Sequence, residues 1–127
     1  DNNTIYVNTF TTGRLYRIPV GKDGAAGAIT QIQPSQAITR PDGLRPLGKN
    51  EFLMIEGVGR LDHVTIDGNT AKIEVLKDGF NGPVAVTRVG DTAWVLEGKL
   101  DYLNDPKLKD KDPGPFKAFA VPMNSKH

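Results

Sequence analysis

Apolar and polar residues alternate over short stretches of this chain, and glycine or proline separates most of these stretches. Residues 60–66, for example, read Arg-Leu-Asp-His-Val-Thr-Ile, an alternation typical of a strand with one buried face. No window of ten or more residues carries a convincing helical period. We therefore expect an all-β fold. The expected strands are residues 4–10, 14–20, 29–32, 44–47, 51–56, 60–66, 71–76, 83–89, 92–96 and 116–122.

The expected strands recur in a fixed order. Residues 3–7, Asn-Thr-Ile-Tyr-Val, resemble residues 50–54, Asn-Glu-Phe-Leu-Met, and residues 91–95, Asp-Thr-Ala-Trp-Val, at spacings of 47 and 41 residues. A repeat of this length that carries four short strands is typical of the blades of a β-propeller. A single blade cannot cover both of its faces, so blades stack on one another.

Counting the blades predicts that the chain is incomplete by itself. The blade at residues 1–40 lacks its first strand, the blade at 41–81 is complete, and the blade at 82–127 lacks its fourth strand. A closed propeller needs at least four blades, and an open arc leaves two apolar sheet faces in water. We therefore expect a segment of about two and a half to three blades. A second polypeptide or a second copy of the chain would complete the ring.

Composition excludes several classes of function. Lys+Arg is 16 and Asp+Glu is 15, so no charge excess favours nucleic acid or an anionic membrane. The chain has no cysteine and two histidines, which excludes thiol catalysis, cysteine-bound metals and a histidine cage within one chain. The first residue is Asp1, which suggests a processed product or a fragment. We favour a periplasmic or secreted location over a cytoplasmic one.

One group of residues resembles a known family. The segment Arg-Pro-Asp-Gly-Leu at 40–44, the strand at 51–55, Gly-Arg-Leu at 59–61 and Asp-Gly at 67–68 are similar to the senescence-marker-protein/gluconolactonase family of regucalcin-like proteins. The resemblance implies the C-terminal half of a six-bladed propeller. It also implies one divalent cation, with calcium first and zinc, magnesium or manganese as alternatives. Members of the family hydrolyse sugar lactones.

Asp42 is the candidate site residue that the resemblance transfers to this chain. It matches the family's Asp of Pro-Asp-Gly, which implies a metal ligand and a carboxylate that activates water. The family's Glu and Asn ligands fall outside this chain. The alternative is a Pro-Asp-Gly turn, in which the Asp caps the backbone and the Gly adopts positive φ. Both interpretations of Asp42 stay open.

The sequence therefore leaves two main hypotheses for the function of this chain. The first is a divalent-metal-dependent hydrolase of the gluconolactonase type, which acts on a small lactone or ester and needs the missing half of the propeller. The second is a non-catalytic propeller that serves as a binding or interaction platform. A related propeller that acts on another small substrate is a third possibility. The sequence does not identify the residues that contact a substrate.

Two glutamates recur at one position of successive repeats. Glu56 and Glu97 are each followed by glycine, which favours a structural hydrogen bond to a neighbouring loop over contact with a polar substrate.

The remaining polar candidates have ordinary structural explanations. Asn8, Arg14 and Arg60 lie near strand ends, where they could ring a channel mouth, although solvated or inter-blade roles are favoured for the two arginines. His63 on an alternating strand favours a surface or inter-blade role over catalysis. Residues 104–115 read as a solvated insertion, with a lid as the alternative.

Overall fold

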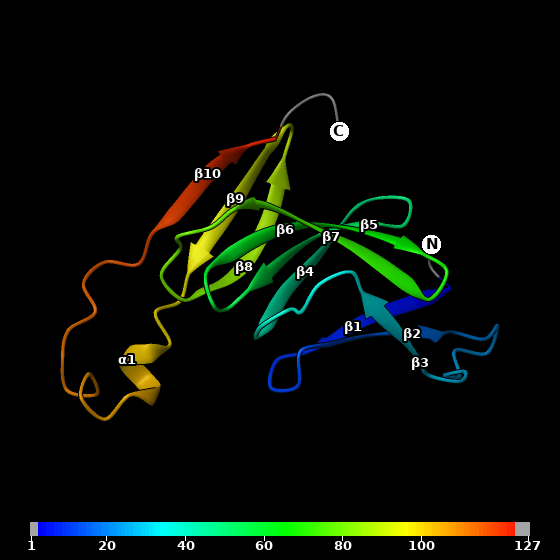
Figure 1. Cartoon of the computed structure of the whole chain (residues 1–127), viewed down its shortest axis with the longest axis horizontal. Coiled ribbons are helices and arrows are strands. Elements are labelled where there is room, and N and C mark those ends of the chain that lie inside the picture. The colour runs from blue at the N-terminus through cyan, green and yellow to red at the C-terminus, as the bar shows by residue number, and fades with distance from the viewer. Residues whose placement is uncertain (1–2, 124–127) are drawn as a thin grey trace.

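The computed structural model describes residues 3–123, and within them the fold is all-β, as the alternation of apolar residues predicted (Figure 1). The strands and the one short helix of these residues are β1 (Thr4–Thr9), β2 (Arg14–Pro19), β3 (Thr30–Pro34), β4 (Pro41–Gly48), β5 (Glu51–Glu56), β6 (Arg60–Asp67), β7 (Thr70–Lys77), β8 (Pro83–Val89), β9 (Thr92–Glu97), α1 (Asp101–Asn104) and β10 (Ala118–Pro122). Each expected strand is present, with ends that differ by a few residues.

Strands that follow one another in the sequence pair antiparallel and make three groups. The first group is β1–β3, the second is β4–β7 and the third is β8–β10. The first two groups join into one seven-stranded sheet of order β1-β2-β3-β7-β6-β5-β4. The edge strands β1 and β4 also contact each other, so this sheet nearly closes into a barrel. The third group is a separate sheet whose β8 packs on β4 and β5.

The join between β3 and β7 was not expected from the sequence. The two strands run parallel over two residue pairs, of which one is Gln33 opposite Thr70. The backbone amide of Gln33 donates to the carbonyl of Asn69 at 2.8 Å, and the amide of Ser35 donates to the carbonyl of Ala71 at 2.8 Å. Backbone hydrogen bonds therefore bridge the expected boundary between the first and second repeats.

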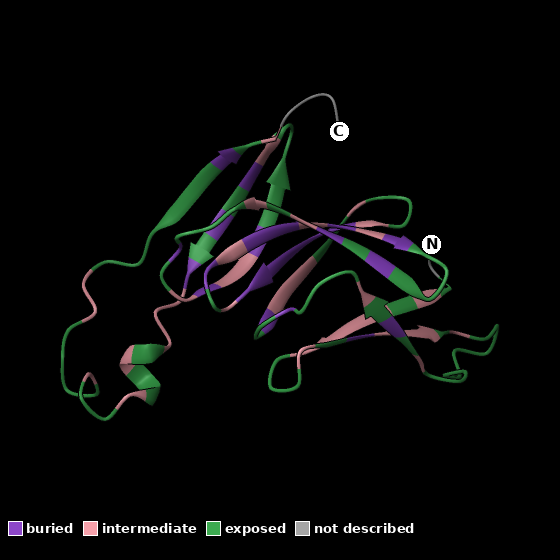
Figure 2. Cartoon of the chain, in the orientation of Figure 1, coloured by how far each residue is buried: buried purple, intermediate pink, exposed green. Residues whose placement is uncertain are grey.

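Strand β5 lies at the centre of the molecule, and both of its faces are buried (Figure 2). Phe52 and Met54 pack into an apolar cluster with residues of the first group. Leu53 and Ile55 point the other way, into a cluster with residues of the third group. A strand that is covered on both faces reads as an unbroken apolar run, which explains the Phe-Leu-Met-Ile sequence here.

The outer faces of the two end groups are apolar and exposed. On β9, Trp94 and Leu96 are 41% and 42% exposed, and their cross-strand partners on β10 are Ala120 and Ala118. On β1, Ile5 is 52% exposed. Strands with one covered face normally carry polar residues on the other, so these faces are unusual for a surface that meets water.

The expectation that Pro41-Asp42-Gly43 forms a turn is wrong. These residues belong to strand β4, where Pro41 pairs with Glu56, and Gly43 does not adopt positive φ. Glycine is needed there for another reason. A Cβ on Gly43 would lie 3.0 Å from the Cα of Ala85, because β4 and β8 approach each other closely.

No helix among residues 3–123 has the length and apolar character that crossing a membrane requires.

Candidate functional site

Asp42 is the second residue of β4 and is half-buried. Burial raises the pKa of its carboxyl group above the ordinary value, because the charged form loses hydration. The side-chain amide of Asn8 donates to the backbone carbonyl of Asp42 at 2.7 Å. The structure thus brings two candidates from the sequence together, through the backbone of Asp42.

The described residues do not complete a cation site around Asp42. Among residues 3–123, no three His, Cys, Asp or Glu side chains are grouped as metal ligands would be. A hard divalent cation takes six or more oxygen ligands from carboxylates, carbonyls, amides and water. The donor set in this part of the chain therefore does not fit the cation by itself.

Glu56 and Glu97 hold the loops that lead into β4 and β8. The amide of Thr39 donates to Glu56 Oε1 at 2.7 Å, and the amide of Asn81 donates to Glu97 Oε2 at 2.6 Å. Both carboxylates are buried, with Glu56 fully inaccessible. The expectation of a structural hydrogen bond to a neighbouring loop is confirmed at both positions.

A buried charged cluster surrounds Glu56. Arg60 Nε lies 3.3 Å from Glu56 Oε2, so Arg60 has an inter-strand role. Asp62 is fully buried beside this pair, and its pKa is raised to about 8. Burial is the main cause, the neighbouring Glu56 carboxyl group raises the pKa further, and Arg60 lowers it.

Asp62 is not among the residues singled out from the sequence, although its position in the alternating pattern marks it. Alternation along β6 puts Asp62 on the same face as Val64 and Ile66, which are core residues. A charged residue at a core-facing position is unusual and marks a perturbed group.

His63 and Arg14 lie apart from this cluster. His63 Nε2 is 2.8 Å from Glu51 Oε1, and its Nδ1 is 3.6 Å from Glu74 Oε1. These are cross-strand neighbours in the sheet, so His63 has a structural role within it. Arg14 is exposed at the start of β2.

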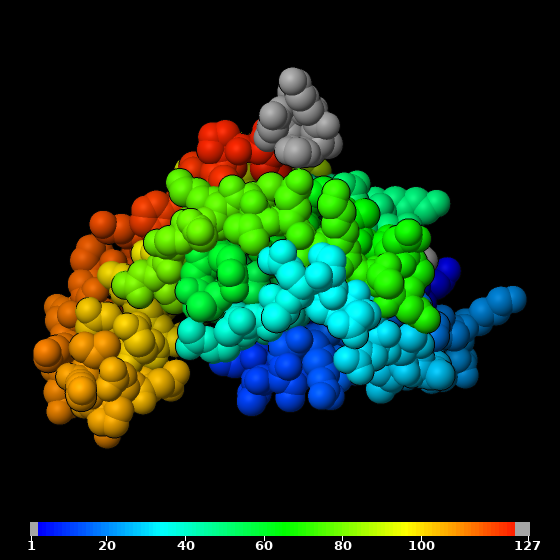
Figure 3. All heavy atoms as spheres, viewed as in Figure 1, coloured from blue at the N-terminus to red at the C-terminus, as the bar shows by residue number. Residues whose placement is uncertain are grey.

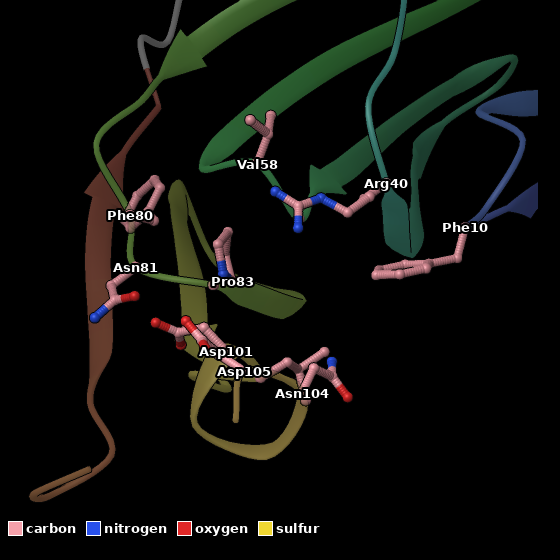
Figure 4. A pocket seen from close by; sticks show the side chains of 12 residues that line it. Phe10, Arg40, Val58, Phe80, Asn81, Pro83, Asp101, Asn104 and Asp105 are labelled. Atoms are coloured by element: carbon pink, nitrogen blue, oxygen red, sulfur yellow. The ribbon is translucent and has the colours of Figure 1, made fainter. Parts of the chain in front are cut away.

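A cavity of about 460 Å³ lies at one end of the strands. Loops between consecutive strands meet there and contribute Phe10, Arg40 and Val58, together with residues 80–83 (Figure 4). Residues of α1 close another side. In Figure 3, α1 and the connection after it form a lobe beside the strands, so the expected insertion at 104–115 starts earlier, before α1. Asp42 does not line this cavity, although Arg40 precedes it by two residues.

No family model, curated protein or solved structure matches the chain. The resemblance to the gluconolactonase family therefore stays a prediction.

Proposed function

We propose that this chain is a segment of a six-bladed β-propeller, the C-terminal half, with blades at residues 1–40, 41–81 and 82–127. The repeated geometry of the second and third groups supports this. Pro41 pairs with Glu56 as Pro83 pairs with Glu97, and the pairing shifts register directly after both prolines. Stacking of β5 between two apolar clusters also supports it, since blades bury each other's faces.

We further propose that the complete propeller is a divalent-metal-dependent hydrolase of a small lactone or ester. One observation carries this proposal. Asp42 and Val84 occupy equivalent positions, each directly after the buried proline that opens β4 or β8. Val84 shows that the repeat folds with an apolar side chain at this position. The half-buried carboxyl of Asp42 is therefore not required by the fold, and a functional role explains it.

In this proposal Asp42 acts as the base. A carboxylate with a raised pKa takes a proton from water more readily than an ordinary one. The resulting hydroxide attacks the ester carbonyl, the ring C–O bond breaks, and the proton passes to the leaving oxygen. Among the described residues, only Asp42 would be available to the cation. The other ligands would come from a second polypeptide or a second copy.

The test compares Asp42→Asn with the matched variant Asp110→Asn, which changes an exposed aspartate in the β9–β10 connection. The protein is purified with whatever polypeptide co-purifies. Hydrolysis of glucono-1,5-lactone is followed with calcium, zinc, magnesium or manganese added, and bound metal is measured by mass spectrometry. We expect Asp42→Asn to lower kcat/KM at least about 100-fold and Asp110→Asn to leave it unchanged. Equal activity of Asp42→Asn and the parent would remove Asp42 from the chemistry.

A non-catalytic binding platform is the second candidate. This function needs no cation and therefore no metal-ligating side chains beyond those of residues 3–123. A purified protein that contains no bound cation and hydrolyses no lactone would establish this alternative over the hydrolase.

A further inference from the structure

The cavity at the end of the strands has opposite charges on opposite walls. Arg40 extends from the β3–β4 connection on one side, and Asp101, Asn104 and Asp105 lie on the other side (Figure 4). Its volume of about 460 Å³ falls within the range of small-molecule sites. Neither the hydrolase proposal nor the resemblance gives these residues a role.

The backbone of Arg40 is held in a defined conformation, and its guanidinium group has no partner within the described residues. Its φ of 53° is uncommon for a residue with a side chain and carries a small conformational cost. Its carbonyl accepts a hydrogen bond from the amide of Gly57 at 2.6 Å, which holds this conformation. Within residues 3–123 the guanidinium has no ion pair or hydrogen bond. An unpaired guanidinium group on a well-held backbone can form two parallel hydrogen bonds with the carboxylate of a ligand.

The opposite wall carries two carboxylates, Asp101 and Asp105, that form no ion pair within the described residues. The side chain of Asp101 has no hydrogen bond or ion pair within the described residues, and Asp105 Oδ1 accepts only the amide of Lys107 at 2.9 Å. Lys107 forms no ion pair with either carboxylate within the described residues, and Lys99, two residues before Asp101, is occupied elsewhere. Its Nζ donates to the carbonyls of Pro113 at 2.8 Å and Pro115 at 3.1 Å. This wall therefore favours a cationic group.

Apolar side chains line the cavity between the two charged walls. Phe80 is anchored in the core and Phe10 lies beside Arg40. Aromatic side chains cover the methylene groups of a ligand while its charged ends meet the two walls.

We propose that this cavity binds a small zwitterion of amino-acid size, with the ligand's carboxylate on Arg40 and its ammonium between Asp101 and Asp105. This site is separate from Asp42, so it goes beyond the proposed hydrolase and does not depend on it.

Isothermal titration calorimetry at low salt tests the proposal with straight-chain ω-amino acids of four, five and six carbons. The comparison ligands are pentanoate and pentylamine, each of which keeps one charged end. We expect one of the amino acids to bind at least about tenfold more tightly than either comparison ligand, because each loses a charge-assisted contact. Pentanoate or pentylamine binding as tightly as the best amino acid would overturn the proposal, and so would no binding of any amino acid.

Matched variants locate the site. Arg40→Gln and Asp101→Asn should each weaken binding about tenfold. The control variants Arg45→Gln and Asp110→Asn change exposed residues away from the cavity and should leave binding unchanged. Circular dichroism of each variant distinguishes lost binding from lost folding. Folded Arg40→Gln with parental affinity would refute the assignment of Arg40.

Discussion

Replacing Asp62 by asparagine should stabilise this protein, and the gain should grow with pH. Asp62 is fully buried beside Glu56, and its pKa of about 8 lies well above the ordinary value of 3.8. The pKa of Asp62 is higher in the folded protein than in the unfolded chain. The contribution of protonated Asp62 to the free energy of unfolding is therefore fully present below pH 4. It is then lost progressively as the pH rises toward 8. Asparagine has nearly the same shape and carries no charge at any of these pH values.

The size of the effect follows from the two pKa values. Each pH unit between the unfolded and folded pKa lowers the free energy of unfolding of the parent by about 1.4 kcal/mol. Up to about 4 kcal/mol is therefore lost by pH 7. The variant escapes this loss, so its advantage over the parent should increase from pH 5 to pH 8.

Urea denaturation followed by circular dichroism at pH 5, 6, 7 and 8 measures this difference. The matched control is Asp110→Asn, which changes an exposed carboxylate and should follow the parent at every pH. Unfolding free energies of Asp62→Asn and the parent that run parallel across this pH range would show that Asp62 does not titrate with a raised pKa in the folded protein. A variant that is less stable than the parent at pH 8 would refute it as well.

Two further predictions concern the close contact of β4 with β8 and the buried glutamate at the end of β9. Gly43→Ala should cost about 1–3 kcal/mol in urea unfolding, because the added methyl would lie against the backbone of β8, whereas Gly48→Ala meets only a flexible side chain. Equal losses for the two variants would count against this packing. Glu97→Ala leaves the backbone amide of Asn81 without its acceptor, the buried Glu97 carboxylate, and should cost about 1–3 kcal/mol in thermal unfolding, while Glu97→Gln restores most of the stability. A Glu97→Gln protein as unstable as Glu97→Ala would argue against the hydrogen bond.

The strands and their repeat were accessible from sequence because they depend on local patterns. Period-two alternation over residues 60–66 identified β6, and the recurrence of Glu-Gly located Glu56 and Glu97 at equivalent positions. The structural role of these glutamates could be predicted because the same residue type at equivalent positions of two repeats indicates the same local hydrogen bond.

Features set by distant contacts could not be predicted. Pro-Asp-Gly is a strong local turn signal. In the fold, however, Pro41 pairs with Glu56 on β5, and the segment is part of strand β4. The parallel pairing of β3 with β7 involves residues such as Gln33, and the sequence around Gln33 has no pattern that predicts a parallel neighbour. The helix α1 has four residues, too few to show a helical period. The cavity joins Arg40 to Asp101, and only folding brings these two residues to one place.

We infer that further protein covers the apolar outer faces of the first and third groups. Size-exclusion chromatography with light scattering, together with the intact mass of each polypeptide in the peak, measures whether it does. We predict a particle heavier than the 13.8 kDa chain, made of two copies or of the chain with a second polypeptide. A single 13.8 kDa chain that stays monodisperse and unfolds cooperatively would show that these faces need no partner.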